Sequence, residues 1–453
     1  MATVPKALPQ ARPLSLWLIG AYIVALMAFP ADFGPRVGGV VLSASRLVLL
    51  AAIVVALVDW RVHLSAARTL PRVVWLGWLA FLASALVTAA LFPSIASWAR
   101  YGSLILEGPV VVLLVYRVAL APGGLRMLVA VTVGATVVVA GMVLALAAGG
   151  QRYDLILSDI AGTEPLSAAS PRFGLERQAG PFRAALYFGI WMAVASALLL
   201  QWMSEGARRV RWIARAAWLL LLVAVFVLTT SRVATTAMFI LPGIYYLVRG
   251  RRATGAAFLV LAVVVGIAFS FLTLGPDLTT GPGDVLPDSS PLRLDAIRAT
   301  LEALRINPLF GWGLLTDVRV LSDLIGVTNF VDNAYLSLLV ELGIVGSAAF
   351  VFLLGVIVLL TRRAWSSAFG LALSIAPICD LAMGVFATTF KASQGYAALF
   401  VLAALALAAA ALAAVASDAR DDLVVRSQTP TTAPQRVSDV PRERRDGDPR
   451  ARA

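Results

Sequence analysis

The sequence predicts an all-α integral membrane protein with about twelve transmembrane helices. Of its 453 residues, 60% are hydrophobic and only 14% are charged, and the mean hydropathy is +0.88. Soluble globular proteins contain about 45–50% apolar residues, so the composition excludes that class. The apolar residues fall into separate runs, and arginines gather between alternate runs. Together these observations predict a polytopic protein with a consistent orientation in the membrane.

A membrane-spanning helix needs roughly 20 mostly apolar residues. Candidate segments lie near 14–30, 38–58, 72–92, 101–118, 125–148, 182–203, 213–229, 232–248, 254–274, 333–360, 366–388 and 394–416. They predict a membrane domain over residues 1–416. Residues 417–453 mix arginine, aspartate, proline and serine with few large apolar groups, and this composition predicts a disordered cytoplasmic tail.

The positions of the arginines predict the topology, because short cytoplasmic loops collect Lys and Arg. With the N-terminus inside, the cytoplasmic loops hold Arg61, Arg68, Arg72, Arg117, Arg126, Arg208, Arg209, Arg211, Arg215, Arg249, Arg251, Arg252, Arg362 and Arg363. The opposite short loops hold Arg36, Arg100, Arg232 and Lys391. We therefore expect both termini in the cytoplasm. The net charge of +12 follows from this topology and does not indicate nucleic-acid binding, since the basic residues punctuate apolar segments.

This topology places two long loops outside, over about 149–181 and 275–332. The second contains "SSPLRLDAIRATLEALRINP", which predicts an amphipathic helix with Ser290 as its N-cap and Pro308 beyond its end. One apolar face is formed by Leu294, Ile297, Leu301 and Leu304. We expect this helix to lie on the outer membrane surface or against the bundle.

The sequence holds one cysteine, Cys379, and one histidine, His63. No Cys/His cluster has the spacing of a zinc site, so no metal or other cofactor is predicted. His63 falls in the first cytoplasmic loop, and chemistry on the outer face must therefore proceed without histidine. An external base would be a carboxylate.

Three arginines at the predicted external face are candidate anion ligands. Arg177, in "RQAGPF", precedes a helix that Gly180 and Pro181 are expected to open, and a helix N-terminus beside a guanidinium suits a phosphate. Arg232, in "LTTSRVATTAMF", lies in a very short turn beside three hydroxyl side chains that can donate to the same anion. Arg293 lies near the start of the loop helix. The alternatives are arginines that contact lipid headgroups or solvent.

The stretch "NFVDNAYLSLLVELGIVG" places Asp332 and Asn333 directly before an apolar helix. Asp332 is the best-placed external carboxylate, and Asn333 is expected to cap the helix. Glu341 lies about two turns further in, and Glu107 and Asp380 also fall within predicted spans. Ionisable groups there indicate a function by default, although buried structural pairing is the alternative. We favour a buried structural partner for Glu341.

The preceding stretch "NPLFGWGLLTD" has glycines spaced as G-x-G. It lacks the strand and the third glycine of a dinucleotide-binding motif. A tight turn that brings the backbone close to the membrane is the better interpretation.

Together these segments resemble the O-antigen ligase and polymerase family. "RQAGPF", "TTSR", "RLDAIRATLEALRINPLFGWG" and "DNAYLSLLVELGIVG" occur in the family's order over roughly residues 170–350. The resemblance implies a metal-independent membrane glycosyltransferase, similar to the GT-C class, in the bacterial cytoplasmic membrane. Its donor would be an undecaprenyl-diphosphate-linked glycan, its acceptor a glycan or lipid hydroxyl on the external face, and its product a surface polysaccharide such as an exopolysaccharide. Membrane lipids and other polysaccharide assembly proteins are the further partners implied.

Carried over to this sequence, the resemblance implies that Arg177, Arg232 and Arg293 hold the diphosphate and that the position before Asn333 orients or deprotonates the acceptor. In ligases of the family that position is typically histidine, whereas here it is Asp332. The departure leaves open whether the protein ligates, polymerises or attaches glycan to another acceptor.

Two other classes fit the predicted spans. A multispan transporter or flippase of lipid-linked sugars is the main alternative, and a receptor-like or structural membrane protein is the second. A transporter is expected to place polar groups along a central pathway. This sequence instead concentrates its polar features at one face, which favours the transferase.

Overall fold

The computed structural model describes residues 13–30, 33–34, 36–37, 40–58, 67–161, 177–182, 184–274, 289–316, 320, 322–324, 333–384 and 393–428. The chain divides into two compact units, Met1–Ala414 and Val415–Ala453. The first unit contains the helical bundle.

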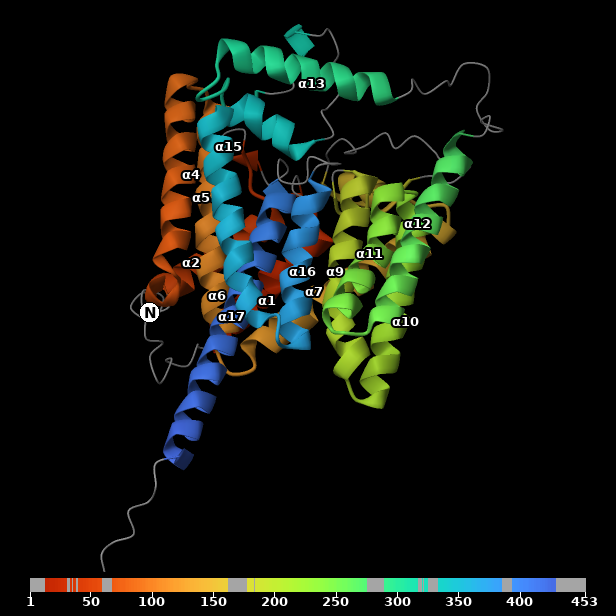
Figure 1. The fold of residues 1–453 in the computed structure, drawn as a ribbon. Coiled ribbons are helices and arrows are strands. Elements are labelled where there is room, and N and C mark those ends of the chain that lie inside the picture. The colour runs from red at the N-terminus through yellow and green to blue at the C-terminus, as the bar shows by residue number, and fades with distance from the viewer. Residues whose placement is uncertain are drawn as a thin grey trace, which may run out of the picture. The chain divides into compact units, whose positions relative to one another are not determined.

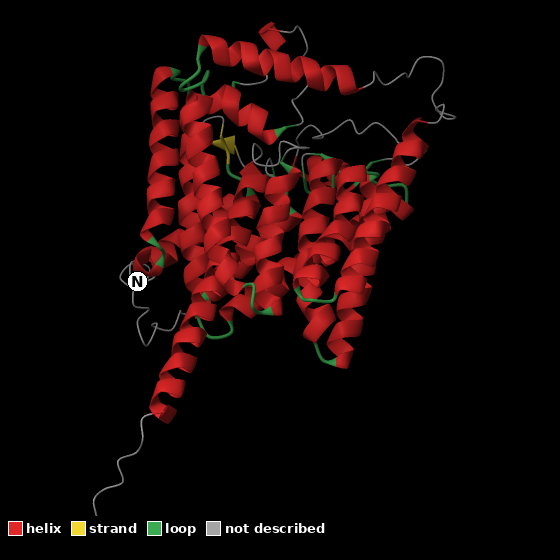
Figure 2. Ribbon diagram, viewed as in Figure 1, coloured by secondary structure: helices red, strands yellow, loops and turns green. Residues whose placement is uncertain are grey.

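Helices account for nearly all of the described structure (Figure 2). The long helices are α1 (Pro13–Ala28), α2 (Ala44–Val58), α4 (Arg72–Leu91), α5 (Ile95–Ile105) with the π-helix η1 (Leu106–Val110) and α6 (Val111–Ala119), α7 (Gly124–Ala148), α9 (Ala185–Glu205), α10 (Arg208–Ala224) with the π-helix η2 (Val225–Thr229), α11 (Arg232–Val248), α12 (Arg252–Leu274), α15 (Ala334–Thr361), α16 (Ala368–Met383) and α17 (Ser393–Gln428). The smaller elements are α8 (Tyr153–Ala161), α13 (Ser289–Ile306), the 3-10 helix η3 (Arg362–Ala364) and a hairpin of β1 (Arg36–Val37) and β2 (Val40–Val41).

Each predicted span coincides with one of these helices. Among the described residues, eight helices are long and apolar enough to cross a membrane, and α1, α2, α11 and α16 are shorter apolar helices. The chain is therefore a multi-pass membrane protein, and the all-helical prediction is confirmed apart from the small hairpin. Helices are the expected solution because hydrocarbon offers no hydrogen-bond partner to backbone N–H and C=O groups.

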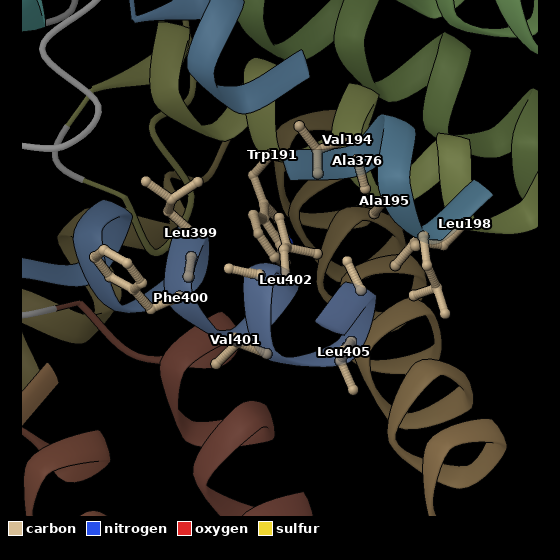
Figure 3. Close-up of a cluster of buried hydrophobic side chains, with 14 of the residues drawn as sticks. Trp191, Val194, Ala195, Leu198, Ala376, Leu399, Phe400, Val401, Leu402 and Leu405 are labelled. Atoms are coloured by element: carbon tan, nitrogen blue, oxygen red, sulfur yellow. The ribbon is translucent and has the colours of Figure 1, made fainter. Parts of the chain in front are cut away.

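The centre of the bundle is formed where α9, α16 and α17 meet. Figure 3 shows Trp191 of α9 close to Leu402 of α17, and Ala195 of α9 close to Ala376 of α16. Runs of alanine in α17 allow neighbouring helices to approach closely, as small residues do in membrane bundles. At the other extreme, α12 buries little of its surface and exposes branched apolar side chains. These side chains suit contact with lipid.

A π-helical turn interrupts α5 and α6 at "LEGPV", where Pro109 lacks a backbone N–H. Glu107 in this turn is buried and forms an ion pair with Arg46 Nε at 2.8 Å. Ser103 also donates a hydrogen bond to Glu107, at 2.7 Å. Of the two interpretations for Glu107, these contacts support the structural pair.

The loop helix α13 lies across one end of the bundle, which we call the α13 end (Figure 1). Its buried face consists of Ala296, Ala299 and Ala303, which pack with Val340 of α15. The predicted apolar face is instead largely turned outward, with Leu294 and Leu301 more than half exposed. The expectation that α13 packs against the bundle holds, but the contacting face differs because small alanines permit a closer approach than leucines.

Helix α17 continues beyond residue 416, where the membrane domain was predicted to end. Helix α17 ends at Gln428, so residues 417–428 are helical, and residues from 429 onward lie outside the described chain. Thr429 precedes Pro430, and the residue before a proline disfavours helical conformation. The sequence therefore explains an end at this point.

Candidate functional site

The "TTSR" motif forms a tight connection between two helices at the α13 end. The π-helix η2 ends at Thr229, and Thr230 adopts a left-handed conformation with φ 43° and ψ 35°. Ser231 then caps α11, its hydroxyl accepting a hydrogen bond from Ala234 N at 3.3 Å. Arg232 is the first residue of α11, and its side chain is exposed. The sequence thus places a guanidinium at a helix N-terminus, where backbone N–H groups favour an anion.

Two of the three hydroxyls in this turn have a hydrogen-bond partner among the described residues, and the third has none there. Thr229 donates its hydroxyl proton to Val225 O at 2.7 Å, and Ser231 is used as the cap. The Thr230 hydroxyl is buried and makes no hydrogen bond to any described residue. The expectation that all three hydroxyls serve an anion is therefore wrong for Thr229, because burial in a helix directs its hydroxyl to the preceding turn.

The "RQAGPF" motif is bonded to the same connection. Gln178 N donates to Leu228 O at 2.7 Å, and Arg177 Nε donates to Thr229 O at 3.0 Å. These carbonyls end a helix and have no intrahelical partner. Two motifs about fifty positions apart in the sequence are thus joined at one point, and Arg177 is held beside the turn that leads to Arg232.

Glycines let α9 approach this connection closely. A Cβ on Gly189 would lie 2.9 Å from both Ala234 Cβ and Thr229 Oγ1. Gly180, with φ 56°, lies against the Phe188 ring. The helix begins at Ala185, a few residues after the predicted opening at Gly180 and Pro181. Gly180 instead serves the turn that brings "RQAGPF" back onto the bundle.

A second feature of the α13 end is a break in α15. Gly343 has φ 65° and ψ −166°, which is not helical. The "NPLFGWG" loop fills the break with four backbone hydrogen bonds. They run from Trp312 N to Val340 O (2.9 Å), Gly313 N to Glu341 O (3.2 Å), Ile344 N to Pro308 O (2.9 Å) and Val345 N to Leu309 O (3.1 Å). The loop therefore satisfies backbone groups that a broken helix would leave unpaired in an apolar surrounding.

The glycines of "NPLFGWG" and "ELGIVG" are required by this contact. A Cβ on Gly343 would meet the Leu309 carbonyl and lie 2.6 Å from Gly311 N. A Cβ on Gly311, whose φ is 66°, would lie 2.5 Å from Val340 O. The predicted tight turn is therefore present, and it brings the backbone of the loop against α15; its expected closeness to the membrane stays a prediction.

Two side chains fasten the same loop to other helices. Thr88 of α4 donates to Phe310 O, and Trp312 Nε1 donates to Ala303 O of α13, both at 3.0 Å. The loop consequently links α4, α13 and α15.

The start of α15 is fixed as the sequence predicts. Asn333 is the N-cap, and its Oδ1 accepts hydrogen bonds from Tyr335 N and Leu336 N, each at 3.0 Å. Ala334 N donates to Gly384 O at 2.9 Å, which joins this helix start to the end of α16. Asn333 is half-buried.

Comparison with known families identifies the segment that carries these features. Residues 216–351 match the family model described as O-antigen ligase. These residues form an O-antigen ligase domain. A domain of this family implies glycosyltransferase activity. A search of curated proteins found no match to the chain.

The ligase domain extends from α10 through α11, α12 and α13 to the part of α15 beyond the break. It includes the "TTSR" connection and both halves of the glycine contact. Arg177 lies outside the matched residues but is hydrogen-bonded to Thr229, which lies inside them. The bonded contact therefore extends the candidate site beyond the family match.

The structure describes the contacts of some predicted site residues but not of others. It joins Arg177 to the connection before Arg232 and confirms the capping role of Asn333. Arg293 lies in α13, but its side chain is outside the described atoms. Asp332 also lies outside the described residues, so its role stays a prediction.

One polar residue near the site was not singled out from the sequence. Gln178 is buried, and its Oε1 makes no hydrogen bond to any described residue. Its position in "RQAGPF", next to Arg177, was the available signal. Within the described chain, no group of three His, Cys, Asp or Glu side chains is arranged to hold a metal ion.

Proposed function

We propose that the protein is a membrane glycosyltransferase that transfers or polymerises glycan from a polyprenyl-diphosphate-linked donor to an acceptor hydroxyl. The observation that carries the proposal is the hydrogen-bonded junction of "RQAGPF" and "TTSR" at the edge of the O-antigen ligase domain. It holds Arg177 beside the helix N-terminus that carries Arg232. Both are suitable ligands for a diphosphate.

The donor side of the reaction follows from these groups. The bond between the anomeric carbon and the diphosphate oxygen breaks, and negative charge develops on the departing lipid diphosphate. Arg177, Arg232 and Arg293 would stabilise that charge through charge-assisted hydrogen bonds. The Thr230 hydroxyl, which makes no hydrogen bond to a described residue, is an additional donor beside the same helix start.

The acceptor side is assigned to the residues before α15. Asp332 would orient the acceptor hydroxyl and take its proton as the oxygen bonds to the anomeric carbon. Asn333, the next residue in the chain, caps the helix that follows. An aspartate in place of the ligase histidine favours a polymerase, or attachment to an acceptor other than a lipid A core.

We place this chemistry on the external face of the bacterial cytoplasmic membrane. All twelve apolar helices would cross the bilayer, with both termini in the cytoplasm, as in membrane glycosyltransferases of the GT-C class. The arginine distribution supports the orientation. The arginine-bearing turns lie at helix ends rather than along a central path, which favours transfer over the alternative of transport or flipping.

Deletion of the gene, followed by analysis of the surface glycan and of lipid-linked intermediates, tests the proposal. A polymerase predicts loss of long chains and accumulation of single lipid-linked units. A ligase predicts long lipid-linked polymer that remains unattached. Unchanged glycan in the deletion strain would contradict both forms of the proposal.

A further inference from the structure

Two buried polar atoms at the junction of "RQAGPF" and "TTSR" make no hydrogen bond to a described residue. They are Oε1 of Gln178 and Oγ1 of Thr230, and each residue is only 2% exposed. Buried polar groups are normally hydrogen-bonded, because they have lost their contacts with water. A buried group that the protein leaves without a partner is open to a ligand or to an ordered water.

The backbone holds the two residues at one place. Gln178 N donates to Leu228 O at 2.7 Å, and Arg177 Nε donates to Thr229 O at 3.0 Å. Thr230 follows Thr229 directly, and it is two positions from Leu228, which is at most about 7.6 Å between the Cα atoms. Both side chains therefore lie within the span of one ligand headgroup.

The neighbours of Thr230 also hold it in place. Thr229 donates its hydroxyl proton to Val225 O at 2.7 Å, and Ser231 caps α11 by accepting from Ala234 N at 3.3 Å. Thr230 itself has φ 43°, a left-handed conformation that a β-branched residue keeps only where the surrounding structure imposes it. The hydroxyl is thus presented from a fixed backbone, as a binding group needs to be.

The chemistry of the Gln178 atom indicates which part of a ligand it would contact. An amide oxygen only accepts hydrogen bonds, so its partner must carry an O–H or N–H group. The phosphate oxygens of a lipid diphosphate are negatively charged acceptors. The sugar joined to that diphosphate carries hydroxyl groups, which can donate to an amide oxygen.

We propose that Gln178 recognises the first sugar of the lipid-linked donor by accepting a hydrogen bond from one of its hydroxyl groups, while the Thr230 hydroxyl donates to the diphosphate. The inference rests on the proposed transferase function and deepens it, because it assigns a subsite for the sugar next to the bond that breaks. Arg177 precedes Gln178 and is held beside Thr229. The contacts to the anion and to the sugar would therefore come from consecutive residues.

A gap that serves only to hold an ordered water makes a different prediction. The water would be the partner of both atoms, and the amide of Gln178 would not distinguish a lipid that carries the sugar from one that lacks it. Removal of the amide would then change the affinities for both lipids alike or leave both unchanged.

The test compares two lipids on the full-length protein in lipid nanodiscs. One is undecaprenyl diphosphate, and the other is lipid-linked glycan extracted from the deletion strain. Their dissociation constants are measured for Gln178→Met, which removes the amide but keeps the length of the side chain. They are also measured for Thr230→Val, which removes the hydroxyl but keeps the branched shape.

Gln201→Met is the matched control. Gln201 of α9 is likewise buried, and its Nε2 makes no hydrogen bond to a described residue. It is twelve residues beyond Gly189, the glycine that approaches Thr229, which corresponds to roughly 18 Å along the helix. The same substitution is therefore made away from the junction.

We expect Gln178→Met to weaken the binding of lipid-linked glycan about fivefold or more, which is the size of effect that one lost hydrogen bond produces. Its affinity for undecaprenyl diphosphate should stay within about twofold of the unaltered protein. Thr230→Val should weaken the binding of both lipids to a similar extent, and Gln201→Met should change neither. If Gln178→Met is not recovered folded, Gln178→Asn withdraws the same amide by one methylene group and carries the comparison.

Unaltered affinity of Gln178→Met for the lipid-linked glycan would overturn the inference. A parallel loss of affinity for both lipids in this variant would overturn it as well, since no selective contact with the sugar would remain. If the unaltered protein binds neither lipid, the proposed function fails instead. The two failures are distinguishable, because the inference is tested only by variants of a protein that binds the donor.

Discussion

Replacement of Gly343 by alanine tests the structural role of the break in α15. The backbone at Gly343 has φ 65° and ψ −166°, a region open essentially to glycine alone, and another residue there costs about 1–3 kcal/mol. The added Cβ would also collide with the Leu309 carbonyl. The helix can relieve the collision only by separating from the loop.

The size of the effect follows from the bonds that are lost. Four backbone hydrogen bonds join the loop to the break, and each contributes about 0.5–1.5 kcal/mol net. Their sum is about 2–6 kcal/mol. We therefore predict that Gly343→Ala lowers the free energy of unfolding by at least about 3 kcal/mol.

The assay is unfolding by SDS in mixed micelles, with Gly355→Ala as the matched control. Gly355 lies in the same helix, and its Cβ position has no neighbour within 4 Å. Alanine there should leave stability unchanged or raise it by about 0.5–1 kcal/mol. Equal stabilities of Gly343→Ala and Gly355→Ala would refute the reasoning.

Three further variants probe separate contacts by the same unfolding assay. Asn333→Ala removes the cap of α15 and should cost about 0.5–2 kcal/mol, whereas no change would show that the cap contributes nothing. Glu107→Gln leaves the Arg46 guanidinium without its buried counter-charge and should cost about 3–5 kcal/mol; a value near zero would mean that water already screens the pair. Ala299→Leu forces a larger side chain into the contact between α13 and α15 and should cost about 1–3 kcal/mol, whereas a neutral result would place α13 elsewhere.

The spans could be predicted from the sequence because each is a local property. A run of apolar residues must become a helix in hydrocarbon, whatever its neighbours are. Helix α17 shows where such prediction fails. Its start was predicted, but its end at Gln428 was not. Polar composition pointed to an end near residue 416, whereas Pro430, which disfavours helix at the residue before it, lies two positions beyond Gln428.

The amphipathic helix α13 shows a different limit. Periodicity identifies a helix with two unlike faces, but it does not say which face meets a protein partner. The leucines were the obvious choice, whereas the structure packs Ala299 and its neighbours against α15. Small residues carry little weight in a hydropathy pattern, although they decide how closely two helices approach.

The contacts of the candidate site depend on residues far apart in the chain. No local pattern in "RQAGPF" shows that Arg177 bonds to Thr229. Likewise, the pattern of "ELGIVG" predicts a continuous apolar helix. Its break at Gly343 is explained only by the close contact with the loop that contains Gly311. The order of the motifs singled out these segments, but the hydrogen bonds that join them could be found only in the structure.

Transfer of glycan by single arginine variants tests the central claim most directly. Arg232→Ala and Arg209→Ala each remove one exposed arginine from the first turn of a helix, but Arg232 begins α11 at the candidate site and Arg209 lies in the first turn of α10. Each variant is expressed in the deletion strain, its insertion in the membrane is verified, and its surface glycan is measured. We predict that Arg209→Ala restores normal glycan and that Arg232→Ala does not. Full restoration by Arg232→Ala would contradict the assignment of this turn to the donor diphosphate.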